Sequence, residues 1–545
     1  MDDLRLSEMA YLNIPDRDRD KSPSPAESMA SSTTDLSTLP MNLGQRRDDS
    51  GGLNSHLVFA ISAAALGSSF QHGYNTGVVN APQELVQKFI REAHRERFQD
   101  LTPLHDIFGN TTIGGHNSTT DTIGDDDLTT VNLIYSIMVS IFCIGGMIGA
   151  LLTGYVAEKF GRKGGLLWNN VFVFLAAGLM GFSKVCRSYE MLIMGRFFIG
   201  FNAGLNAGLA PMYLTEISPT NMRGAIGTIY QLVITISIFT SNLLGLPQVL
   251  GTEDKWPILF AVTIVPAIFT LATLPMCPES PKYILIFQNK DVQAQRALTW
   301  LRGTIEVHDE MDDMRAEYES MKLVPKVTLH ELWYNSMLRQ PLIIALVVML
   351  SQQFSGINAV IFFSTSIFEK AGLNKSAALY ATLGIGVINV LMTIVSLVLV
   401  EKSGRKTLLL TGLGGMMFTT IVLTFCLALK DTFESLSYVS ILAVYVFIVM
   451  FASGPGSIPW FLVAELFGVG ARAMATSIAV SVNWTANFVV GLAFLPLQET
   501  MGGYVFVIFT VLLALFWLFV YKKVPETKGK TVEEIAAAFR QKAYQ

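Results

Sequence analysis

Long apolar runs separated by short polar segments dominate the chain. Each run is about 20 residues long, the length that an α-helix needs to cross the hydrocarbon core of a bilayer. Only helices and closed barrels satisfy their backbone hydrogen bonds in lipid, so the pattern predicts an all-α polytopic membrane protein. Twelve such runs can be read, at 57–79, 131–153, 164–182, 190–210, 225–246, 257–275, 341–367, 377–400, 407–428, 439–467, 473–493 and 503–522.

The composition supports this class. Of 545 residues, 51% are hydrophobic and 15% are charged, against roughly 25% charged in soluble domains. The net charge of −4 is spread over tails and loops and gives no indication of nucleic-acid binding. The four cysteines lie in or beside apolar runs without paired spacing, so neither a disulfide framework nor a metal site is expected, and no cofactor is predicted.

The polar segments divide the chain into five parts. Residues 1–55 are rich in Ser, Thr and Pro and are predicted to be a disordered tail. Residues 282–340 are charged and helix-prone, and they separate six apolar runs from six. We therefore predict two six-helix bundles, at 56–281 and 341–522, joined by a helical linker and followed by a tail at 523–545.

Lysine and arginine set the predicted orientation. Both are abundant in the linker and in the C-terminal tail, and basic residues favour the cytoplasmic side of a membrane. Both termini are therefore predicted to be cytoplasmic, and the loop at 80–130 faces outward. This loop contains the sequences Asn110-Thr-Thr and Asn117-Ser-Thr, which are acceptor patterns for N-glycans.

Three short sequence motifs, which we call words, occur twice along the chain and in the same order. EKFGRKG at 158–164 returns as EKSGRKT at 401–407. EISPTNMR, which runs from Glu216 to Arg223, corresponds to ELFGVGAR, and PESPKY corresponds to PETKG. Because each word follows the corresponding apolar run of its half, the two halves are predicted to be structural duplicates.

All these words fall on the predicted cytoplasmic side. Two similar bundles can rock about a central site, and we expect arginines and glutamates to pair across the cytoplasmic seam when that side is shut. Each exposed pair contributes about 0–1 kcal/mol, which suits a latch that must reopen. The alternative is local helix capping and anchoring to the membrane surface. The predicted latch residues are Arg162, Glu216, Arg223, Glu279, Glu401, Arg405, Glu465 and Arg472.

Several motifs resemble those of the sugar porter family of the major facilitator superfamily. They are the two GRK words, PESPKY, QQFSGINAV at 352–360, GPGSIPW at 454–460 and PETKG. STSIFEKAG, NWTANF and VPETKGKT are similar to the animal facilitative glucose transporters that prefer glucose. The resemblance covers about residues 56–540 and implies a major facilitator fold, a hexose substrate and a plasma-membrane carrier rather than an enzyme.

Amide side chains within the apolar runs indicate the binding site. Amides in a membrane span are costly unless they meet partners or a water-filled cavity, and they can match hydroxyls of a neutral sugar as donors or acceptors. Gln352 and Gln353 converge with Asn358 only if the helix unwinds, which Gly356 allows. The resemblance implies the sugar-site residues Gln231, Gln352, Gln353, Asn358, Asn389, Trp460, Asn483 and Asn487, and the gating residues Phe362, Phe363, Phe451 and Trp484.

The mode of transport follows from a missing carboxylate. In proton-coupled members of the family, a carboxylate in the first span partners an arginine in the fourth; here Asn75 stands at that position while Arg196 remains. Facilitated diffusion is therefore favoured over proton symport. Ala452 is typical of fructose carriers and Trp460 of glucose carriers, so D-glucose is favoured and fructose stays open. A sugar sensor that does not transport is the third alternative.

Overall fold

The structure is a computed structural model that describes residues 53–99, 122–219, 222–325, 327–430, 432–433, 435–530, 534–535, 537 and 539. These residues form helices and connecting segments, and no strand occurs among them. The helices of the first half are α1 (Ser55–Ala64), α2 (Phe70–Gly77), α3 (Gln83–Gln99), α5 (Thr122–Phe160), α6 (Arg162–Trp168), α7 (Asn170–Phe182), α8 (Tyr189–Ile217), α9 (Arg223–Leu244), α10 (Trp256–Ala261) and α11 (Ile264–Thr273). A π-helical turn, Ala65–Ser69, joins α1 to α2.

The linker and the second half continue this all-helical pattern. The linker contains α12 (Pro281–Ile286), α13 (Asp291–Arg302), α14 (His308–Lys322) and α15 (Leu329–Tyr334), so its predicted helical character is confirmed. The second half contains α16 (Ser336–Phe354), α17 (Ile357–Lys370), α18 (Lys375–Lys402), α19 (Arg405–Leu429), α20 (Leu436–Ser453), α21 (Ile458–Leu466), α22 (Val469–Met501) and α23 (Val505–Lys523).

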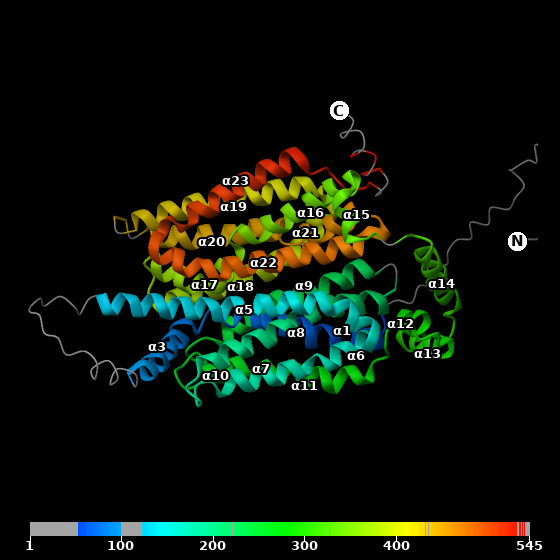
Figure 1. Ribbon diagram of the computed structural model, residues 1–545, viewed down its shortest axis with the longest axis horizontal. Helices are drawn as coiled ribbons and strands as arrows, with labels where there is room; N and C mark the ends of the chain where they lie inside the picture. The colour runs from blue at the N-terminus through cyan, green and yellow to red at the C-terminus, as the bar shows by residue number, and fades with distance from the viewer. Residues whose placement is uncertain are drawn as a thin grey trace, which may run out of the picture. The chain divides into compact units, whose positions relative to one another are not determined.

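The two halves pack against each other lengthwise. Figure 1 shows the second-half helices, yellow-green to red, beside the first-half helices, blue to green. The seam between the halves is formed mainly by α5 against α22 and by α9 against α18. Helix α3 lies at one end of the bundles and the linker helices α12–α14 lie at the other (Figure 1). We call these the α3 end and the linker end.

The predicted spans agree with the helices. Eight helical stretches in the described residues are long and apolar enough to cross a membrane, and the last of them, Gly470–Lys523, covers two predicted spans. The three remaining predicted spans, 57–79, 190–210 and 225–246, are also helical. The first of these spans is interrupted by the π-helical turn, and the other two are α8 and α9. The twelve predicted spans are therefore all found as helices.

Small residues let α5 and α8 cross closely. A Cβ on Gly200 would lie 2.1 Å from the Phe142 carbonyl oxygen, and one on Gly204 would lie 2.0 Å from that of Gly146. Neither position tolerates a side chain, because the backbones are in direct contact. Helices in a membrane gain little from the hydrophobic effect when they associate, because lipid tails are as apolar as their side chains. Close packing of backbones at small residues drives their association instead.

The linker contacts both halves. Buried Arg302 donates to the Ile217 carbonyl oxygen at 2.8 Å, at the end of α8, and forms an ion pair with Glu310. Toward the second half, the Val327 amide donates to the Gly470 carbonyl oxygen at 3.2 Å. Thr328 caps α15, and its hydrogen bonds hold the pKa of Glu331 below its usual value. The division of the chain into domains at 281 and 341 stays a prediction.

Candidate functional site

A break in the helix brings the predicted amides together. Helix α16 ends at Phe354 and α17 begins at Ile357. Between them Gly356 has φ of 90° and ψ of 10°, a left-handed conformation that side chains disfavour. The break turns Asn358 back so that its amide donates to Oε1 of Gln353. The unwinding expected at Gly356 is confirmed.

Gln352, Gln353, Asn358 and Asn483 form a buried network of hydrogen bonds. Asn483 from α22 donates to Gln352 Oε1 at 2.8 Å, and Gln353 donates to Asn483 Oδ1 at 3.0 Å. Gln352 also donates to the carbonyl oxygens of Pro455 and Gly456, at 3.0 and 2.7 Å. The break between α20 and α21 exposes these carbonyls, so two broken helices and α22 meet at one polar cluster.

The other predicted sugar-site residues lie outside these hydrogen bonds. Asn487, one turn from Asn483, is buried, and its Oδ1 has no partner among the described residues. Gln231 on α9 is exposed, and Asn389 on α18 is half-buried. Trp460 is 42% exposed. Gln231 and Asn389 come from the two helices that form one side of the seam, whereas the network itself belongs to the second half.

Aromatic side chains surround the amide network. Trp484 is buried and stacks on His72 of α2, with ring centroids 6.0 Å apart, so it bridges the two halves. His72 Nδ1 lies 3.0 Å from the Tyr230 hydroxyl. Of the predicted gating residues, Phe362 and Phe363 are buried, and Phe363 stacks on Phe494. Phe451 is half-buried at the end of α20.

The buried Arg196 has no carboxylate partner among the described residues. Its Nη1 donates to the Asn75 carbonyl oxygen at 2.8 Å, and the guanidinium lies over the Phe142 ring, 4.6 Å from its centroid. The Asn75 amide donates instead to the Gln71 carbonyl oxygen and to Thr263. Asn75 carries an amide, which does not ionise, so it cannot exchange a proton with the arginine.

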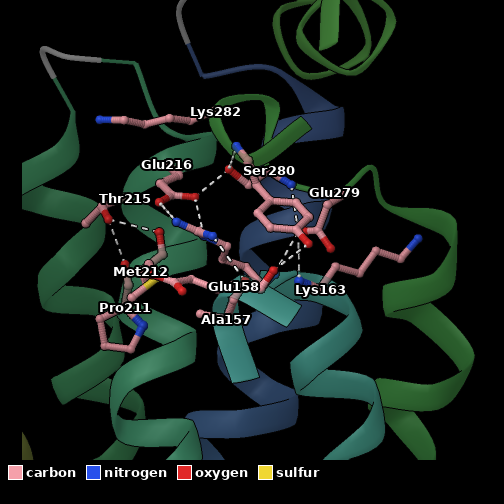
Figure 2. A network of polar contacts seen from close by, with 12 residues as sticks. Ala157, Glu158, Lys163, Pro211, Met212, Thr215, Glu216, Glu279, Ser280 and Lys282 are labelled. Carbon is pink, nitrogen blue, oxygen red and sulfur yellow. Dashed lines mark hydrogen bonds and ion pairs between the residues drawn. The ribbon is translucent and has the colours of Figure 1, made fainter. Parts of the chain in front are cut away.

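The first half carries a dense charge cluster at the linker end. Arg162, the first residue of α6, forms two 2.9 Å contacts with the Glu216 carboxylate at the end of α8. Ser280 also donates to Glu216, and these two residues point toward each other in Figure 2, whereas Lys282 extends away. Glu279 accepts hydrogen bonds from the amides of Arg162, Lys163 and Gly164, which begin α6.

The second half repeats this arrangement. Arg405, the first residue of α19, donates to Glu465 Oε1 at 3.1 and 3.0 Å. Thr527 donates to Glu465, and Glu526 accepts from the amides of Arg405 and Lys406. In both halves a carboxylate caps the start of a helix, as the helix dipole favours, and an arginine offsets a glutamate near the end of another helix, where the dipole disfavours an anion.

In this structure the described arginines pair within their own half, and the latch expected when the cytoplasmic side is shut stays a prediction. Arg162 and Arg405 both pair with a glutamate of their own half. The physical reason is that the paired residues sit on neighbouring helix ends of one bundle. Arg472 donates to the Phe467 carbonyl oxygen rather than to Glu465. The side chains of Arg223 and Glu401, and both predicted glycan acceptors, Asn110 and Asn117, lie outside the described residues.

Sequence reasoning missed Ser280, Glu526 and Thr527. A signal for them was present, because PESPKY and PETKG place a glutamate and then a hydroxyl at matching positions. The carbonyls of Pro455 and Gly456 were missed for a different reason. Backbone acceptors carry no side-chain signature, and only the broken helix around them indicates that they are free to bind.

Comparisons with known proteins decide the family. The family model described as "Sugar (and other) transporter" matches residues 60–539. The chain belongs to this transporter family. Facilitated glucose transporter member 1 of solute carrier family 2, from Gallus gallus, is 45% identical over 490 residues, covering 90% of this chain and 94% of the relative. Member 3 from Ovis aries is 46% identical over 483 residues, covering 89% and 92%.

Solved structures of the family share the fold. The xylose transporter XylE from E. coli in a partially occluded inward open conformation aligns with a TM-score of 0.69 at 24% identity, over 88% of this chain and 100% of that one. Its inward open conformation aligns with a TM-score of 0.70 at 23% identity. The chain is thus a multi-pass membrane transporter with the major facilitator fold.

Proposed function

We propose that the protein carries a hexose, D-glucose in the first place, across the plasma membrane by facilitated diffusion. The observation that carries this proposal is the uncharged amide network of Gln352, Gln353, Asn358 and Asn483. The identity of about 45% to facilitated glucose transporters over nearly the whole chain supports it.

The chemistry of the network suits a neutral polyol. Each sugar hydroxyl is both donor and acceptor, and an amide offers both roles on adjacent atoms. The unpartnered Asn487 oxygen and the exposed Gln231 supply further groups on the two sides of the seam. At roughly 1 kcal/mol net for each hydrogen bond, the site holds a sugar weakly enough to release it.

The surroundings of Arg196 favour uniport. A coupled carrier needs a group that gains and loses a proton as the protein cycles, and Asn75 cannot do so. Symport is the alternative, since XylE is a proton:xylose symporter. At 24% identity that likeness supports the fold and not the coupling.

Alternating access is the proposed mechanism, with both termini in the cytoplasm and the α3 end outside. Contacts at the α3 end support closure on that side: Asn80 donates to Ser364 at 2.6 Å, and Asn132 donates to Glu499 at 2.6 Å, both across the seam. The charge clusters would hold the helix ends of each half together while the halves move.

Uptake by purified protein in proteoliposomes tests the proposal. Labelled D-glucose should enter and be displaced by unlabelled D-glucose more effectively than by D-fructose. Gln353→Leu should raise the apparent KM about fivefold to tenfold, because one or two hydrogen bonds to the sugar or its partners are lost. Gln288→Leu, which changes a glutamine exposed in the linker, is the matched control and should behave as the wild type. Binding without flux would favour the sensor instead.

A further inference from the structure

Two carboxyl groups meet across the seam at the α3 end. Glu84 lies in the first turn of α3, in the first half, and Glu369 lies one residue before the end of α17, in the second half. The Glu369 carboxyl is within hydrogen-bonding reach of the Glu84 carboxyl. Lys375, at the start of α18, forms an ion pair with Glu84. At this end of the seam, the Glu84 carboxyl of the first half therefore faces the Glu369 carboxyl and the Lys375 ammonium of the second half.

The cations nearby compensate the charge of Glu369 only in part, because Lys375 acts on both carboxyl groups. Lys375 is bound to Glu84, and Glu369 Oε1 is buried without accepting a hydrogen bond from a described donor. Lys370, next to Glu369 in the chain, lies near the charges of Glu499 and Lys430 instead. Two ionised carboxylates in such contact repel each other, whereas one protonated partner donates a hydrogen bond to the other.

We propose that Glu84 and Glu369 form a proton-operated clasp that favours closure of the α3 end when the solution on that side is acidic. Protonation of Glu369 turns a repulsive contact into a hydrogen bond between the halves, and loss of the proton weakens the closed state. The placement of this end outside the cell rests on the proposed function.

The clasp biases an existing closure rather than creating it. Close by, Asn80 donates to Ser364 and to the Ile361 carbonyl oxygen and accepts from the Thr365 amide. These neutral hydrogen bonds hold the same seam at every pH. The clasp proton comes from the α3 side and returns to it when the seam opens, so no proton crosses the membrane. Acid sensitivity of this kind is therefore distinct from proton symport.

Distances between two spin labels across the seam test the clasp. Labels at Glu92→Cys on α3 and Ser376→Cys on α18, both exposed positions, report the seam in full-length protein in proteoliposomes; the exposed Cys186 is replaced by Ser. Between pH 8 and pH 5.5 the ratio of closed to open molecules should rise roughly tenfold, within the usual range of coupling between a site and a conformational equilibrium.

Variants in which glutamine replaces one of the two glutamates distinguish the clasp from other effects of acid on the protein. Glu369→Gln keeps a donor in the contact at every pH and leaves the ion pair of Glu84 with Lys375 intact, so it should stay closed and respond little to pH. Glu84→Gln also removes that ion pair, so it should lose the pH response without the same gain in closure. Glu253→Gln, which removes an exposed carboxylate paired with Lys88 inside the first half, should respond as the wild type. A flat wild-type profile, or an unaltered response in both amide variants, would overturn the clasp. D-glucose uptake by the same vesicles tests the proposed function separately, since a pH response without uptake would refute only that function.

Discussion

Arg162 and Arg405 hold equivalent places in the two halves but lie in different surroundings. The side chains of Arg162 and Glu216 are 9% and 13% exposed, whereas those of Arg405 and Glu465 are 20% and 27% exposed. Arg162 contacts both oxygens of its glutamate and lies over the ring of Tyr283, 5.1 Å from its centroid. Arg405 contacts one oxygen only.

This difference shows that the same repeated word forms two ion pairs that contribute unequally to stability. A buried charge is stable only when it is paired and hydrogen-bonded, so the cost of losing its partner grows with burial. The linker supplies the extra cover in the first half, because Tyr283 belongs to α12. The duplicated words therefore predict which residues form each charge cluster, while the linker determines how deeply the cluster of the first half is buried.

Arg162→Ala should have the largest effect. It leaves Glu216 poorly solvated and without its cation, and should lower the free energy of unfolding by roughly 3–5 kcal/mol. Thermal unfolding in detergent measures this change. Lys159→Ala removes an exposed cation from the last turn of α5 and should change stability by less than about 0.5 kcal/mol. Equal losses for the two variants would show that burial of the pair is unimportant.

Arg405→Ala should have a smaller effect. Its pair is more exposed, so we expect a loss of roughly 1–2 kcal/mol, between the values for surface and buried pairs. The same unfolding measurement applies, with Lys402→Ala, an exposed neighbour, as control. If Arg405→Ala destabilised the protein more than Arg162→Ala, the comparison between the halves would be reversed.

The two hydroxyls should produce the smallest and most similar effects. Ser280→Ala and Thr527→Val each remove one donor to a glutamate, which costs about 1 kcal/mol. Ser280 is fully buried and also caps α12 by accepting from the Tyr283 amide, so its loss should be greater than that of Thr527. Paired measurements in an Arg162→Ala or Arg405→Ala background would detect the coupling within each cluster. Strictly additive losses would argue against a shared network.

The sequence predicted the architecture well and the contacts less completely. Span length and hydropathy determine the helices, and the duplicated words determine which helix ends carry charge. The convergence of Asn358 on Gln353 was predictable because Gly356 permits the required turn. The direction of pairing was not, because Glu216 and Glu465 are each compatible with two arginines. Only the packing of α6 on α8 within one half selects Arg162 for Glu216.

The steady-state distribution of labelled D-glucose under an imposed pH gradient tests the central claim of facilitated diffusion most directly. Proteoliposomes are loaded at one pH and placed in medium at another, and the sugar concentrations inside and outside are compared once uptake stops. Because Asn75 offers Arg196 no titratable partner, the account predicts equal concentrations whatever the gradient, even if the initial rate depends on pH. Accumulation above the outside concentration, abolished when the gradient is collapsed, would contradict it and establish proton coupling.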